Sequence, residues 1–153
     1  ALAEAVGDAR DDPGSTRMAG RLAPIVKDDE EKTDQRLIAK LHAAGQLRPS
    51  YLLRALRERK LSLFRAALAT LGDYPMADVK KAIEANRSEM LALACAGVGV
   101  DRSAFPTILA HIRELNGGRP LGDSDRARRA FDVFRPDQAN LAAAAFRRAI
   151  GSV

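Results

Sequence analysis

The sequence has no tryptophan, and aromatic residues make up only 5% of its 153 residues. A β-sandwich is built from β-branched and aromatic side chains in strands that alternate apolar with polar positions, and no stretch of this chain has that pattern. Ala and Leu instead dominate a hydrophobic share of 46%, which favours close packing of helices. We therefore predict an all-α fold with no sheet.

Cysteine is equally scarce. Cys95 is the only thiol, which excludes an internal disulfide and a zinc site of paired cysteines. No uninterrupted apolar run reaches the roughly 18 residues of a membrane span, and no basic and then apolar signal segment opens the chain. The sequence thus favours a cytoplasmic protein with no role at a membrane.

What the sequence does contain is a series of apolar stripes at helical spacing, separated by glycine and proline. They predict seven to nine short helices, within residues 17–26, 28–45, 48–59, 61–73, 76–86, 87–97, 98–118, 124–135 and 136–151. The connections are about 2–7 residues long, which favours antiparallel neighbours stacked as helical hairpins. We expect a HEAT-like array or an irregular bundle.

Local signals predict where several helices begin and end. Pro24 should kink or end the first helix. The acids of residues 28–31 should then complement the dipole at the start of the second, which Gly45 closes. Segment 87–97 is apolar nearly all round, so we expect it to be the central buried helix.

Two later helices have candidate N-caps. Asp101 or Ser103 is expected to cap one of them, and Ser124 or Asp125 the other. The last helix is expected to bury the apolar side chains Leu141, Ala145 and Ile150.

The domain organisation follows from the turn-forming residues near the start of the chain. Residues 7–16 are turn-formers and the sequence opens without Met, so we interpret 1–14 as a stub of an upstream helix or a linker. Residues 15–153 form a single all-α domain in this interpretation, within which 119–153 can make a C-terminal helical hairpin.

No residue pattern predicts catalysis or a metal or cofactor site. His42 and His111 lack partners at metal-ligand spacing, and Cys95 sits in an apolar helix that favours an inert core thiol. The segment "GGRPLGD" (117–123) lacks the Gly-Lys-Ser/Thr of a phosphate loop, and we interpret it as a flexible linker. We expect no enzyme activity and no cofactor.

The net charge of +5 is concentrated. Residues 48–65 alone carry +5, whereas 1–47, 66–118 and 119–153 carry −2, −1 and +3. A concentrated field of one sign attracts anionic partners. The candidate partner-binding residues in this stretch are Arg54, Arg57, Arg59, Lys60 and Arg65.

Residues 37–109 resemble an uncharacterised bacterial family, mainly alphaproteobacterial, called domain of unknown function 2336. The resemblance is carried by the positions Leu41, Gly45–Leu47, Leu52–Leu56, Leu63–Leu71, Cys95–Gly99 and Phe105. It implies an all-α, HEAT-like arrangement and no established activity. The family often has glycine where this chain has Arg59, so a left-handed turn there would cost about 1 kcal/mol, unless the turn is remodelled or the two helices are fused.

Three interpretations of the basic stretch remain. The first is that it is only the solvated side of two helices. The second is a surface that docks an acidic or helical segment of another protein, and the third is a nucleic-acid-binding surface. Nucleic-acid modules usually add aromatic stacking residues, and Tyr51 is the sole aromatic nearby. As a function we therefore favour a non-enzymatic protein–protein interaction module over a nucleic-acid-binding domain.

Overall fold

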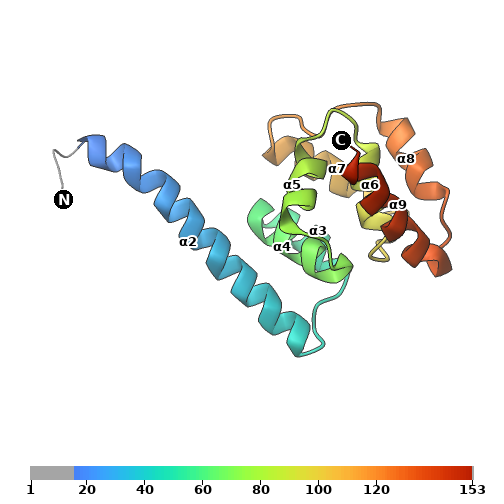
Figure 1. Cartoon of the computed structure of the whole chain (residues 1–153), viewed down its shortest axis with the longest axis horizontal. Coiled ribbons are helices and arrows are strands. Elements are labelled where there is room, and N and C mark those ends of the chain that lie inside the picture. The colour runs from blue at the N-terminus through green and yellow to red at the C-terminus, as the bar shows by residue number, and fades with distance from the viewer. Residues whose placement is uncertain (1–15, 153) are drawn as a thin grey trace. The chain divides into compact units, whose positions relative to one another are not determined.

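The computed structural model describes residues 16–152, with side chains from residue 29 onward. In that part of the chain it contains eight α-helices, one 3₁₀ turn and no strand, which confirms the all-α prediction. The elements labelled in Figure 1 are α2 (Thr16–Ala43), α3 (Ser50–Arg57), α4 (Leu61–Gly72), α5 (Met76–Glu84), α6 (Glu89–Ala96), α7 (Phe105–Leu115), α8 (Ser124–Asp132) and α9 (Ala139–Gly151), with the 3₁₀ turn η1 (Pro136–Gln138) before α9.

The chain divides into two compact units, Ala1–Asp34 and Gln35–Val153. All described residues of the first unit belong to α2, which continues through Pro24, so the prediction that the first helix ends there is wrong. The acids of 29–31 consequently lie inside the helix and not in its first turn. A proline within a helix costs about 3 kcal/mol through one lost hydrogen bond and a clash, and the 28-residue α2 accommodates it without ending.

The second unit is organised around α6. Six of its eight residues are buried, and it packs against α8 and α9 as well as against its chain neighbour α5 (Figure 1). A helix with such a uniform apolar surface has no solvent side to present, so other helices cover it. The prediction that segment 87–97 is the central helix is confirmed.

Tyr74 joins three helices of this unit. It follows α4, its hydroxyl donates to the carbonyl of Ala94 on α6 at 3.0 Å, and its ring centre lies 4.7 Å from that of Phe146 on α9. Gly97, after α6, lies so close to α9 that an added Cβ would come within 2.8 Å of the Cα of Ala143. Absence of a side chain at Gly97 is therefore what lets these two helices approach.

The remaining helices complete a bundle-like packing. Successive helices pack as neighbours from α3 to α6, while α3 also contacts α7 across the sequence. The rings of Phe105 at the start of α7 and Phe131 on α8 stack with centres 5.2 Å apart. Contacts between helices distant in sequence thus close one core within residues 35–152.

Three predictions about the later helices are wrong. The N-cap of α7 is Ala104, with no side-chain bond, because Ser103 donates its hydroxyl to Asp101 in the preceding turn. The N-cap of α8 is Asp123, whose carboxylate accepts from the backbone N–H of Asp125 at 2.8 Å. Leu141 is half exposed, since it faces away from the core; of the other two residues expected inside α9, Ala145 is half-buried and Ile150 is buried.

Segment 117–123 is fastened to the turn between α5 and α6, which corrects its interpretation as a flexible linker. The backbone N–H of Leu121 donates to the carbonyl of Ala85 at 3.0 Å, and the hydroxyl of the buried Ser88 donates to the carbonyl of Asp123 at 3.3 Å. The guanidinium of Arg113 on α7 donates to two carbonyls of the same segment, those of Pro120 and Gly122, at 2.7 and 2.8 Å.

Candidate functional site

The predicted partner-binding residues, here called the basic patch, are Arg54, Arg57, Arg59, Lys60 and Arg65. The first two lie on α3, the next two in the turn after it, and Arg65 on α4. All are exposed except Arg65, which is half-buried. The patch therefore spans a helical hairpin whose two helices pack directly against each other.

The turn inside the patch ends α3 in a Schellman motif. The N–H of Arg59 donates to the carbonyl of Leu56 and the N–H of Lys60 to that of Ala55, both at 2.9 Å. This geometry needs a left-handed residue, and Arg59 supplies it with φ of 60°. The two helices are separate, not fused, and a non-glycine residue occupies the position that favours glycine.

Three of the five patch cations have no ion-pair partner among the described side chains. Arg54 lies 3.5 Å from the carboxylate of Glu58, in a pair whose side chains are 74% and 51% exposed, so water screens their attraction. Among the side chains of residues 29–152, Arg57, Arg59 and Lys60 have no ion-pair partner. Three uncompensated cations thus face solvent at the end of α3.

The patch has no exposed apolar neighbour in its own sequence. The large hydrophobic side chains that are exposed in the described chain, Leu37, Leu121, Val133 and Leu141, all lie outside residues 48–65. Tyr51 is half-buried and packs against the core. Among the described side chains, the patch segment accordingly offers charge and hydrogen-bond donors and exposes no large hydrophobic side chain.

Cys95, His42 and His111, the residues weighed for catalysis or metal binding, lie on three different helices. Cys95 is fully buried, and burial raises the pKa of its thiol to about 12, so it is neutral at physiological pH. His42 lies on α2, while His111 lies on α7 with Glu114, 4.0 Å away, as its acidic neighbour. Throughout the described residues, no three His, Cys, Asp or Glu side chains are grouped as metal ligands would be.

In the described part of the chain, no helix combines the length and the apolar character needed to cross a bilayer.

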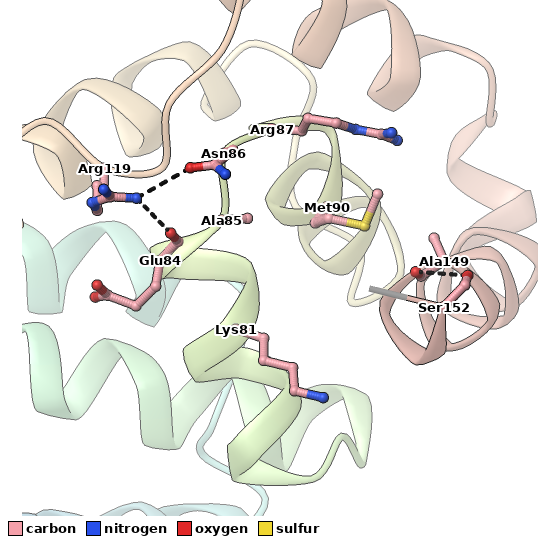
Figure 2. A pocket seen from close by; sticks show the side chains of 9 residues that line it. All are labelled: Lys81, Glu84, Ala85, Asn86, Arg87, Met90, Arg119, Ala149 and Ser152. Carbon is pink, nitrogen blue, oxygen red and sulfur yellow. Dashed lines mark hydrogen bonds between the residues drawn. The ribbon is translucent and has the colours of Figure 1, made fainter.

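A hollow that sequence reasoning missed opens elsewhere in the second unit, with a volume of about 790 Å³. Figure 2 shows it between α5 and the C-terminal end of α9. Lys81, Arg87 and Arg119 supply its cations and Met90 an apolar wall. These residues are up to 38 positions apart in sequence, so only the packing of α5, α6 and segment 117–123 reveals them as neighbours.

Comparison with known proteins gives one match. A family model described as "Uncharacterised protein conserved in bacteria (DUF2336)" matches residues 2–147. No curated protein and no solved structure matches.

Proposed function

Because the chain belongs to this uncharacterised bacterial family, whose description assigns no activity, we propose from its surface that it is a non-enzymatic protein–protein interaction module of the cytoplasm. The basic patch docks an acidic segment of another protein. The helical-repeat, HEAT-like description of the module is part of this proposal.

The observation that supports the proposal most is the uncompensated charge of Arg57, Arg59 and Lys60, which are exposed at one end of α3. Such a group raises the local concentration of acidic surfaces and speeds their association, and it requires no chemistry from the protein. The neutral, buried thiol of Cys95 agrees with a non-catalytic role.

Protein is favoured over nucleic acid by the position of Tyr51. Single-stranded nucleic acid is held largely by bases stacking on aromatic rings, and Tyr51 is half-buried against the core. Helix α3 is also only eight residues long, which limits how many side chains it can present to a groove.

The experiment is a quantitative co-purification from nuclease-treated bacterial lysate with three forms of the full chain. They are the wild type, R54E/R57E/K60E in the patch, and R126E/R129E/R148E as a control that makes the same charge change at exposed positions of α8 and α9. We expect proteins retained by the wild type and the control to be lost from the patch variant. Circular dichroism checks that all three forms are equally helical.

Equal recovery by the wild type and the patch variant overturns the proposal. A gel shift of labelled duplex and single-stranded DNA at low salt tests the nucleic-acid alternative. DNA binding that is lost in the patch variant and falls steeply with salt would replace the protein partner by nucleic acid.

A further inference from the structure

The 790 Å³ hollow is lined by cations that have no ion-pair partner in the described part of the chain. Lys81 and Arg87 are exposed, and neither has a hydrogen-bond or ion-pair partner among the side chains of residues 29–152. Figure 2 shows the two with Met90 between them. The one acid of the lining, Glu84, is directed away from Lys81 and accepts from the amide of Asn116 at 3.0 Å.

The third cation of the hollow is fixed in place. Arg119 donates to the carbonyl of Glu84 at 3.0 Å and to the side chain of Asn86 at 3.4 Å (Figure 2). Both acceptors are uncharged, so Arg119 keeps its positive charge available while its position is held. The hollow thus combines one anchored and two uncommitted cations.

A second hollow in the same unit shows that this arrangement is not general. Its volume is about 510 Å³, and Arg102 and Arg135 line it beside Phe131 and Phe134. There, Arg102 lies 3.0 Å from Asp132, and Arg135 lies 3.3 Å from Asp137. Each arginine of the second hollow thus has a nearby acid as a partner, whereas Lys81 and Arg87 of the first hollow have none among the described side chains.

The apolar part of the first hollow defines the rest of the ligand. The half-buried Ala85 at the end of α5 and Ala149 on α9 line it, and the buried Met90, with 4% of its surface exposed, forms its floor. Burying thioether and methyl groups against an apolar body contributes favourable binding free energy, whereas such groups make no favourable contact with a small hydrated anion. A volume of this size lies within the range of sites that hold small organic molecules.

We propose that this hollow binds an amphipathic organic anion, whose acidic group pairs with Lys81 or Arg87, the two cations on either side of Met90, and whose apolar body lies on Met90, Ala85 and Ala149. The site is separate from the basic patch in sequence and in lining residues, so it stands or falls independently of the proposed function.

The test uses 8-anilinonaphthalene-1-sulfonate, an aromatic sulfonate that fluoresces in apolar surroundings, titrated into the full chain. The variants are K81E/R87E in the first hollow and R102E/R135E in the second, a matched control with the same charge change. We expect K81E/R87E to weaken binding about tenfold, and R102E/R135E to change it less than about twofold. The variant K81Q/R87Q removes the cations without adding repulsion and should weaken binding about threefold.

Competition in the wild type checks the class of ligand. We expect dodecanoate to displace the dye and inorganic phosphate at equal ionic strength to leave it bound. The proposal is overturned if the wild type does not bind the dye, if the Lys81 and Arg87 variants bind it as the wild type does, or if phosphate displaces it as well as dodecanoate.

Discussion

Arg147 on α9 donates from its guanidinium to the carbonyl of Gly72, the last residue of α4, at 2.7 Å. The central carbon of this guanidinium lies 5.3 Å from the centre of the Tyr74 ring, close enough for a cation–π interaction. The Arg147 side chain thus provides a hydrogen-bond donor for the last carbonyl of α4 and covers the Tyr74 ring, which links α4, α6 and α9. An added Cβ at Gly72 or at Gly97 would overlap the Tyr74 side chain, so this junction depends on glycine at both positions.

Replacing Gly97 by Ala should destabilise the fold by about 1–3 kcal/mol, because the new methyl group would overlap the Tyr74 hydroxyl and the backbone of Ala143. Gly151, in α9, is the matched control, since a methyl group there meets no atom within 4 Å. We expect G151A to be neutral or stabilising by up to about 1 kcal/mol. Urea denaturation measures both, and equal effects would contradict the close approach at Gly97.

Replacing Arg59 by Gly should stabilise the protein by about 0.5–1 kcal/mol, because its φ of 60° lies in the region that favours glycine. The same change at Arg57, the last residue of α3, should destabilise it by about 1 kcal/mol, because glycine weakens a helix. The two variants have the same composition and charge. Effects of the same sign in urea denaturation would show that the Schellman turn is absent in solution.

Replacing Arg113 by Ala should destabilise the fold by about 1.5–3 kcal/mol. The change removes donors to the carbonyls of Pro120 and Gly122 and to the hydroxyl of Ser124. R113K should recover only part of the loss, since an ammonium cannot reproduce the planar fork of a guanidinium.

Hydrogen exchange locates the effect of R113A. The amide of Leu121, which donates to the carbonyl of Ala85, should exchange faster, while amides of α4 keep their relative protection. The control R126A changes an exposed arginine of α8 and should stay within about 0.5 kcal/mol of the wild type. An unaltered Leu121 amide would argue against the fastening of segment 117–123.

Stability should fall at alkaline pH because of Cys95. Burial raises the pKa of its thiol from 9.0 to about 12, so above pH 9 the unfolded chain releases a proton that the folded chain keeps. The thiol's contribution is complete below pH 9 and is lost between pH 9 and about 12, approaching about 1.4 kcal/mol per pH unit.

The comparison is with C95A, which lacks this titration and should show a shallower decline of the unfolding free energy above pH 9. The decline that remains in C95A is assigned to Tyr74, whose pKa burial also raises. Parallel curves for the wild type and C95A between pH 8 and 10.5 would contradict the buried thiol.

Much of the helical framework follows from short-range signals. Gly45, predicted to close the second helix, has a positive φ, a conformation that few other residues adopt without strain. The uniform apolar surface of α6 predicts its central place, since burial from all sides is the only stable environment for it.

Helix starts were harder to predict where several capping residues are adjacent. Asp123, Ser124 and Asp125 are all good caps, and the backbone of Asp123, held by Ser88, decides among them. Ser103 and Asp101 bond to each other, which removes both from α7. These outcomes depend on contacts that propensity does not include.

The basic patch could be predicted from the sequence, whereas the hollow could not. Charge excess in one short stretch can be counted from the sequence, so the patch is visible there. Lys81, Arg119 and Ala149 become neighbours only through the packing of the second unit, and no local pattern relates them.

The fastening of segment 117–123 sets a limit on how the protein can be shortened. Ser88 is the only fully buried polar residue in the described chain, and Asp123 supplies the carbonyl that its hydroxyl needs. A fragment ending before residue 117 would leave that hydroxyl without its acceptor and would open the α5–α6 turn to water. The smallest piece worth expressing therefore keeps both segments, and α8 and α9 are best studied together with the helices that precede them.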